Sequence, residues 1–285
     1  MSQRLTALIP AHNEEYLLDL CLRSLVDHFD EIVVLDDCST DRTWDVAGDA
    51  LRGHPRFMML RGATPGAGWI EARNRLLAAT DSDWLFFLDA DDVLCEYNAR
   101  LLRQIAEGRQ PVVRLQLAEL WGDFHHTTGR YRHYDRCHTF VNRRIVGDLA
   151  WGGGTTARPQ GNGRGGWRAK GGPGPLLIHC KGVKPDRRLV ERQRVRGWMG
   201  AGRPGRLEEW ADLDELSAEQ IHRRALHMLL ESRQDRIRRV DDRMPRLPRV
   251  IREAPDRFEI VYDGDRPVDR LDHGTSPPGG PSDAA

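Results

Sequence analysis

The chain has 285 residues, and its 43 lysines and arginines balance its 43 aspartates and glutamates. This balance argues against a general nucleic-acid binder, which usually carries a basic excess. The length suits one large α/β domain with additions, or one domain beside a small partner.

The sequence shows no sign of an oxidising or membrane environment. Its five cysteines are scattered, odd in number and lack a CxxC pair, so neither a disulfide framework nor a zinc site is expected. The first residues lack the apolar core of a signal peptide, and no run of about 18 apolar residues predicts a transmembrane helix. We therefore expect a cytoplasmic protein.

The first 110 residues alternate short apolar runs with amphipathic runs. Strands are expected at 5–9, 32–35, 57–60 and 84–88, and helices at 14–29, 39–51, 69–79 and 96–106. This alternation predicts an α/β fold with a mostly parallel central sheet covered by helices on both faces. Ligands bind beyond the carboxyl ends of the strands in such sheets, so polar residues at those ends are the first candidates for function.

The pattern changes after residue 110, and three further parts are expected. Residues 111–204 are predicted to hold strands near 112–121, 137–142 and 176–178, a glycine-rich loop at 151–175 and a basic helix at 185–199. Residues 205–250 are predicted to form a helical extension, with Ser217 and Gln220 making a capping box for a helix to about Val240. Residues 251–285 are expected to be irregular and, from Gly274 onward, disordered.

Acidic residues follow the fourth apolar run, where Leu88 leads into Asp89, Ala90, Asp91 and Asp92. Three adjacent carboxylates repel one another unless a positive group sits among them. A divalent cation that also binds a diphosphate meets this need, because it takes hard oxygen ligands. The alternative for so short a motif is a loop whose aspartates cap the next helix.

Two upstream segments place polar groups at the same edge of the predicted sheet. Asp36 and Asp37 follow the second strand, where a carboxylate can accept from a nucleobase N–H or a ribose hydroxyl. Residues 39–41 can cap the next helix at the same time. Pro10 ends the first strand, so the polar residues after it can face the same ligand; a plain strand–helix turn is the alternative.

Together these segments resemble family 2 glycosyltransferases of the GT-A fold. Their order and approximate separation match over roughly the first 110 residues, and a weaker likeness extends from about Phe140 to Arg196. The matching residues are Ile9-Pro10-Ala11-His12-Asn13-Glu14, Val34-Leu35-Asp36-Asp37-Cys38-Ser39-Thr40-Asp41, Ala72-Arg73-Asn74 and Leu88-Asp89-Ala90-Asp91.

The resemblance implies a nucleotide-diphospho-sugar donor, with uridine as the commonest nucleoside, a Mn²⁺ or Mg²⁺ ion, and transfer with inversion. The residues that it places around the nucleotide are Pro10, His12, Asn13, Glu14, Asp37, Arg73, Asp89 and Lys181. Those that it places on the metal are Asp91, Asp89 and His179. A lone histidine is more often structural, which is the alternative for His179.

The acceptor side departs from the family's pattern. An inverting transfer to a hydroxyl needs an acidic residue within hydrogen-bond reach of it. The position where many relatives carry this residue reads Gly154-Thr155-Thr156 here. The remaining candidates for the base are Asp148, Asp123 and Asp92, and turn capping is the alternative for Asp148. An acceptor that needs no strong base, or a diverged chemistry, would also account for the departure.

The glycine-rich segment also contains three arginines and a tryptophan, which are Arg158, Arg164, Arg168 and Trp167. We predict a mobile lid that closes over the donor, with a disordered insertion as the alternative. The basic helix after Pro185 and the helix after Ser217 can form a homodimer contact or an acceptor wall, or simply pack within the domain.

Three functions are compatible with the sequence. Sugar transfer to a small-molecule, glycan or peptide acceptor is favoured. A non-catalytic nucleotide-binding scaffold is suggested by the missing acid at Thr155 and Thr156. A nucleotidyltransferase is disfavoured, because residues 10–15 lack the basic, glycine-rich signature usual near the first strand of such enzymes.

Overall fold

The computed structural model describes residues 3–62, 69–127, 139–147, 149–152, 158–160, 167–169, 175–180, 182–191, 213–233, 238–239, 247–254, 261–263 and 266–268. The chain divides into two compact units. The first comprises Met1–Ala118, Arg130–His179 and Met244–Ala254, and the second comprises Glu119–Gly129, Cys180–Arg243 and Pro255–Ala285.

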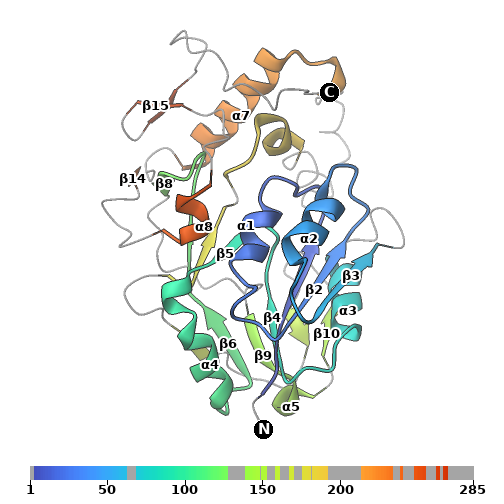
Figure 1. Ribbon diagram of the computed structural model, residues 1–285. Helices are drawn as coiled ribbons and strands as arrows, with labels where there is room; N and C mark the ends of the chain where they lie inside the picture. Colours follow the sequence, from blue (N-terminus) through green and yellow to red (C-terminus); the bar gives the residue numbers. More distant parts are fainter. Residues whose placement is uncertain are drawn as a thin grey trace. The chain divides into compact units, whose positions relative to one another are not determined.

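A seven-stranded sheet forms the centre of the first unit, with the strand order β12-β6-β9-β4-β1-β2-β3 (Figure 1). Its strands are β1 (Leu5–Ala11), β2 (Glu31–Asp36), β3 (Phe57–Arg61), β4 (Trp84–Phe87), β6 (Val112–Leu115), β9 (Thr139–Asn142) and β12 (Trp167–Ala169). Neighbouring strands are parallel, except that β9 runs antiparallel to both β4 and β6. The sheet is mixed but mainly parallel, so the predicted α/β class is confirmed.

Helices cover both faces of this sheet. Successive side chains of a strand point to opposite faces, so each strand contributes residues to both layers. The helices are α1 (Leu18–Arg23), α2 (Thr43–Leu51), α3 (Trp69–Ala78) and α4 (Arg100–Glu107). Phe86 of β4 packs in the layer that contains α1, α2 and α4. The next residue, Phe87, packs in the opposite layer with α3.

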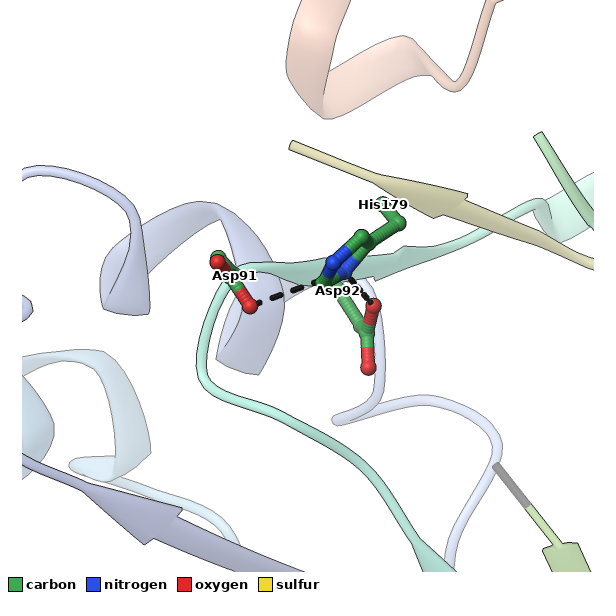
Figure 2. A group of neighbouring side chains, drawn as sticks. All are labelled: Asp91, Asp92 and His179. Atoms are coloured by element: carbon green, nitrogen blue, oxygen red, sulfur yellow. Dashed lines mark hydrogen bonds and ion pairs between the residues drawn. The ribbon is translucent and has the colours of Figure 1, made fainter. Parts of the chain in front are cut away.

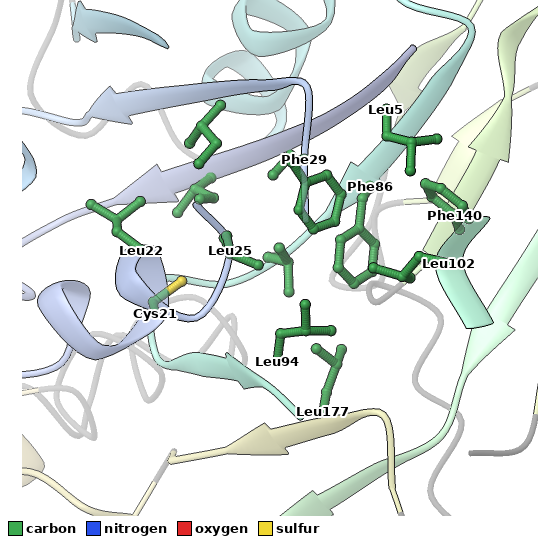
Figure 3. Packing of buried hydrophobic residues seen from close by; sticks show 14 of the residues in the cluster. Leu5, Cys21, Leu22, Leu25, Phe29, Phe86, Leu94, Leu102, Phe140 and Leu177 are labelled. Carbon is green, nitrogen blue, oxygen red and sulfur yellow. The ribbon is translucent and has the colours of Figure 1, made fainter. Parts of the chain in front are cut away.

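Aromatic rings lie at the centre of the larger layer. Phe29 stacks on Phe86 with ring centroids 5.3 Å apart, and Phe140 meets Phe86 edge-on at 5.6 Å. Buried leucines from several elements surround these rings (Figure 3). This packing joins β4 to β9 and holds the strand that leads into the acidic motif.

The first helix is shorter than the predicted 14–29. Only α1 is α-helical in this segment, and residues 24–28 continue as turns. Ser24 donates from Oγ to the carbonyl of Cys21 at 2.6 Å. Such side-chain hydrogen bonds compete with the helical backbone pattern, which accounts for the early end of α1.

The predicted strand at 112–121 is two strands in two sheets. After β6, β7 (Leu117–Glu119) joins a smaller sheet with the order β5-β13-β7, where β5 is Asp92–Leu94 and β13 is Leu177–His179. Between β6 and β7, the carbonyl of Gln116 accepts from the backbone N–H groups of Leu176 and Leu177. The antiparallel pairing of β13 with β5 sets His179 opposite Asp92.

Parts of the glycine-rich segment are also regular. β10 (Ala150–Gly152) pairs antiparallel with β11 (Arg158–Gln160), and β12 pairs with β6. The prediction of a loop throughout 151–175 is therefore wrong for these strands, whose backbone groups find partners in sheets.

The second unit has its own small core around Trp121, with α7 (Ala218–Arg233) and the helical residues 186–191 packed in it. The predicted capping box is confirmed: Gln220 N donates to Ser217 Oγ at 3.2 Å, and Ser217 N donates to Gln220 Oε1 at 2.8 Å. After α7, β14 (Arg238–Arg239) pairs with β8 (His126–Thr127).

The remaining elements are short. They are η1 (Glu96–Asn98), α5 (Arg143–Val146), η3 (Leu213–Glu215), α8 (Arg249–Arg252), β15 (Val261–Asp263) and β16 (Arg266–Val268). Because β15 and β16 pair antiparallel, the expectation of irregular structure from residue 251 is wrong for them. Among the described helices, none is both long and apolar enough to cross a bilayer.

Candidate functional site

The carboxyl ends of β1, β2 and β4 meet at one edge of the large sheet, because β1 is the parallel neighbour of both other strands. The segments that leave these ends begin with His12, Asp37 and Leu88. All three polar segments singled out in the sequence therefore lie at the same edge.

Hydrogen bonds join the first two of these segments. Asn13 donates from its backbone N to Ser39 Oγ at 2.8 Å, and its Oδ1 accepts from Thr40 N at 2.7 Å. Glu14 N donates to Thr43 Oγ1 at 2.7 Å. Asn13 adopts a φ of 52°, a left-handed conformation that asparagine tolerates better than most residues. Ser39 thus supports the segment after β1, whereas the sequence suggested only a cap for the next helix.

Asp36 and Asp37 have different surroundings although they are adjacent. Asp36 is buried and accepts from Ser39 N through Oδ1 at 3.1 Å. Asp37 is half-buried, and its backbone carbonyl lies 2.7 Å from Nδ1 of His12. Asp36 therefore holds the turn, and Asp37 is the carboxylate better placed to meet a ligand.

The carboxyl group of Asp37 is less acidic than usual. Burial raises the pKa of Asp37, the nearby His12 lowers it, and the carboxylates of Asp36 and Glu71 raise it again, with a net increase. A hydrogen-bond donor on a ligand would relieve this unfavourable setting of the charge.

Gly62 allows the Asp37 turn to approach β3 closely. A Cβ atom at Gly62 would lie 2.9 Å from Asp37 Oδ1 and 3.1 Å from Asp37 Cα. The backbone N of Gly62 also donates to the carbonyl of Asp36 at 2.7 Å. The sequence pattern did not single out Gly62, since nothing local marks a contact with a turn 25 residues earlier.

The third segment is held from α3. Arg73 donates from Nη2 to Asp89 Oδ1 at 2.7 Å, and its guanidinium lies over the Trp151 ring, 4.7 Å from the centroid. The neighbouring Asn74 exchanges two hydrogen bonds with the backbone of Trp151, at 2.7 and 3.0 Å. The sequence predicts that Asp89 contacts both the nucleotide and the metal. In the structure its carboxylate forms an ion pair with Arg73.

A compact acidic group lies at the start of β5. Ligand atoms of Asp91, Asp92 and His179 lie within 4.8 Å of one another, and all three side chains are buried. His179 Nδ1 is 2.7 Å from Asp92 Oδ1 and 3.6 Å from Asp91 Oδ1. Both carboxylates reach toward the imidazole (Figure 2).

The chemistry of this group fits a divalent cation. Buried carboxylates beside an imidazole suit a metal such as Mn²⁺, which takes carboxylate oxygens and tolerates nitrogen. Among the residues that the structure describes, no other three such side chains lie this close together. The sequence placed Asp91 and His179 here, but treated Asp92 as a candidate base.

The candidate bases are differently placed. Asp123 lies in the second unit and accepts from the backbone N of His125 and of His126, both at 2.8 Å. Asp92 is fully buried within the acidic group. Asp148 and Lys181 lie outside the described residues, as do Arg164 and the side chains of Arg158, Trp167 and Arg168.

Residues 6–136 match the sequence model of Glycosyl transferase family 2. This stretch is therefore similar to family 2 glycosyltransferases. The matched stretch contains all three polar segments, so the resemblance seen in the sequence is confirmed over this part of the chain.

The similar curated proteins are longer than this chain. Glycosyltransferase SunS from Bacillus phage SPbeta is 29% identical over 102 residues, which cover 36% of this chain and 23% of that protein. A poly(ribitol-phosphate) beta-glucosyltransferase from Bacillus spizizenii is 26% identical over 96 residues, covering 32% of this chain and 15% of that protein. The chain thus matches less than a quarter of the length of either relative.

Solved structures show a wider but looser likeness. TarS 1–349 from S. aureus has a TM-score of 0.47 at 15% identity, with 81% of each chain covered. Glucosyl-3-phosphoglycerate synthase from Mycobacterium tuberculosis, in complex with Mg²⁺ and uridine diphosphate, has a TM-score of 0.37 at 20% identity, with 50% of this chain and 58% of that chain covered.

Proposed function

We propose that the chain is a GT-A-type glycosyltransferase that moves a sugar from a nucleoside-diphosphate sugar to an acceptor, with the help of a divalent cation. The observation that carries this proposal is the buried group of Asp91, Asp92 and His179, in which Asp91 is the last residue of the Asp89-Ala90-Asp91 motif. The acceptor class and the donor sugar are not specified by these residues.

The nucleoside is proposed to bind at the joined segments after β1 and β2. Asp37 offers a carboxylate whose charge is poorly stabilised in the folded chain, so it gains from a base N–H or ribose hydroxyl. The hydrogen bonds from Asn13 and Glu14 to Ser39 and Thr43 support a fixed shape for this surface. A preformed site loses less entropy on binding. A uridine nucleotide is favoured because it is the commonest in the family.

The metal is proposed to be held by Asp91 and His179, next to the nucleotide. A bound Mn²⁺ or Mg²⁺ supplies Lewis-acid stabilisation of the negative charge that develops on a departing diphosphate. The imidazole in the ligand set favours Mn²⁺ over Mg²⁺, which prefers oxygen ligands and water. Arg73 holds Asp89 beside this group, so that Asp89 can accept from the ribose or from a water on the metal.

The base is proposed to be Asp148, and the transfer is proposed to invert the anomeric centre. The other two candidates, Asp92 and Asp123, are less suited to act as the base, because each already accepts two or more hydrogen bonds from its neighbours. Asp148→Asn should lower kcat at least about a hundredfold, a typical contribution of general base catalysis, with little change in nucleotide affinity. Should Asp123→Asn show this loss in its place, the base is Asp123.

A thermal-shift screen tests the donor site. The wild-type chain is heated with uridine, guanosine, adenosine and cytidine diphosphates, each with Mn²⁺ and with EDTA. A nucleotide at a hundred times its Kd should stabilise the fold by about 2.7 kcal/mol. One nucleotide should raise Tm with Mn²⁺ and raise it less with EDTA.

Two variants make the screen specific. Asp91→Asn should lose the Mn²⁺-dependent part of the shift, whereas Asp27→Asn, which alters an exposed aspartate remote in sequence from the acidic motif, should keep it. A wild-type chain whose Tm responds to none of the nucleotides would contradict the proposal.

A further inference from the structure

We propose that Asp92 is a positioning residue that fixes the tautomer of His179, so that the imidazole presents Nε2 to a divalent cation. This inference rests on the metal site of the proposed function and adds a role for a residue outside the Asp89-Ala90-Asp91 motif. It begins from the unequal distances of the two carboxylates from the His179 ring.

Of the two carboxylates, Asp92 lies within hydrogen-bond distance of His179 Nδ1. The distance from His179 Nδ1 to Asp92 Oδ1 is 2.7 Å, within the range of a charge-assisted hydrogen bond. The corresponding distance to Asp91 Oδ1 is 3.6 Å, beyond a normal hydrogen bond. Asp91 Oδ1 is thus the more distant of the two carboxylate oxygens from this nitrogen.

The other oxygen of Asp92 fixes the carboxylate in place. Asp92 Oδ2 accepts from the backbone N of Asp89 at 2.7 Å, and Asp92 N donates back to the carbonyl of Asp89 at 3.0 Å. The side chain has no exposed surface. One buried carboxylate therefore links the acidic turn to the end of β13, where the strand register sets His179 opposite it.

This arrangement determines which ring nitrogen carries the proton. When the Asp92 carboxylate is ionised it only accepts hydrogen bonds, and Nδ1 of His179 is then the donor. A neutral imidazole with its proton on Nδ1 has its lone pair on Nε2, which is one of the two forms in which histidine binds metals. Carboxylates that hold metal-binding histidines in this way commonly affect metal affinity by about 10- to 100-fold.

Asparagine at position 92 cannot reproduce both contacts. Its side chain has one acceptor oxygen, but Asp89 N–H and His179 Nδ1–H are both donors. If the oxygen faces Asp89, the amide NH₂ faces His179, which must then accept at Nδ1 and carry its proton on Nε2. Asp92→Asn should therefore shift the tautomer and weaken the metal site, while Asp91 keeps its carboxylate.

The chain offers a matched control in its second unit. His222 Nδ1 lies 2.6 Å from Asp186 Oδ2, and both side chains are buried, as in the Asp92–His179 pair. Asp186→Asn removes the same kind of contact outside the acidic group. It should lower stability without changing the affinity for Mn²⁺.

The test combines two measurements on the full chain. The ¹⁵N NMR shifts of the His179 ring are recorded without metal at about pH 8, above the ordinary pKa of histidine, and assigned by their absence in His179→Gln. Mn²⁺ affinity is then measured by electron paramagnetic resonance. We expect Nδ1–H in the wild type, Nε2–H in Asp92→Asn, and an Mn²⁺ Kd about 10- to 100-fold higher in that variant only.

An Nε2–H tautomer in the wild-type chain would overturn the inference. This measurement is made on the wild type, so it does not depend on whether any variant folds. The inference would also be overturned by a wild type that binds no Mn²⁺, or by an Asp92→Asn chain that binds it as tightly as the wild type. Neither measurement involves a sugar donor. A chain with the expected tautomer and Mn²⁺ affinity but no donor turnover would refute the proposed function and leave this inference standing.

Discussion

Arg73 and Asp89 form an ion pair 2.7 Å long whose two side chains are 3% and 18% exposed. The pair connects α3 to the turn that carries the acidic motif. Trp151 covers the guanidinium, and Asn74 fixes the backbone of that tryptophan. The conformation of the motif thus depends on residues from β10 as well as on its own sequence.

Breaking this pair should destabilise the chain, because one buried charge loses its partner. Arg73→Met is expected to lower the free energy of unfolding by about 3 kcal/mol, and Asp89→Asn by a comparable amount. The double variant should lose about 1–3 kcal/mol less than the sum of the two single-variant losses in free energy of unfolding, since each single variant already removes the same contact. Urea unfolding of the four chains measures this coupling, and strictly additive losses would show that the pair contributes nothing.

Gly62 and Gly48 provide a matched test of the close approach at Asp37. Gly62→Ala places a Cβ 2.9 Å from Asp37 Oδ1, so it should displace the turn and cost about 1–3 kcal/mol. Gly48 lies within α2, where a Cβ would meet only Met59 Sδ at 3.9 Å. Gly48→Ala should therefore stabilise the chain by about 0.5–1 kcal/mol.

The two alanine variants should also differ in ligand binding. Gly62→Ala should weaken nucleoside diphosphate binding, measured by calorimetry, while Gly48→Ala leaves the affinity unchanged. Equal affinities in both variants would argue against Asp37 as a nucleotide contact.

The sequence predicted the parts of this site that depend on local pattern. Alternating apolar runs gave the central strands, and the position of Asp37 and Asp89 after two of those strands placed them at one sheet edge. The partners of these residues come from distant segments. His179 reaches Asp92 only because β13 pairs with β5, and the two residues are 87 positions apart.

Ser39 shows why local rules describe the loops incompletely. Its hydroxyl suits a helix cap, and the sequence alone predicts that use. In the fold the hydroxyl accepts from Asn13 N, because the parallel pairing of β1 and β2 brings the two segments together. Which donor a serine meets is decided by tertiary structure, and its own neighbours in sequence do not reveal it.

Stability should depend on pH in opposite ways at two aspartates. Burial raises the pKa of Asp37 with a net increase in the folded chain. Burial alone would also raise the pKa of Asp30, but hydrogen bonds from Arg103 and Leu5 N–H outweigh it, and that pKa is lowered. A raised pKa gives stability that is present below the unfolded value of about 3.9 and is lost as pH rises through the folded pKa.

The two asparagine variants separate these signs. As pH rises above about 4, the wild type loses the stability that protonated Asp37 contributes, whereas Asp37→Asn has no such contribution to lose. The free energy of unfolding of Asp37→Asn should therefore rise relative to that of the wild type. As pH rises to about 4, the wild type gains stability from its ionised Asp30, which Asp30→Asn cannot gain. The free energy of unfolding of Asp30→Asn should therefore fall relative to that of the wild type and remain lower at higher pH. Urea unfolding at a series of pH values gives both curves, and the same sign in the two variants would contradict the assignment.

The most direct test of the central claim is release of nucleoside diphosphate from nucleotide sugars by the purified chain. The donors are uridine and guanosine diphosphate sugars, incubated with Mn²⁺ or with EDTA. We expect one donor to be cleaved with Mn²⁺, and cleavage to fall at least about tenfold with EDTA or in Asp91→Asn. A folded chain that binds Mn²⁺ and a nucleoside diphosphate, yet cleaves none of the donors, would contradict the claim and identify a nucleotide-binding protein.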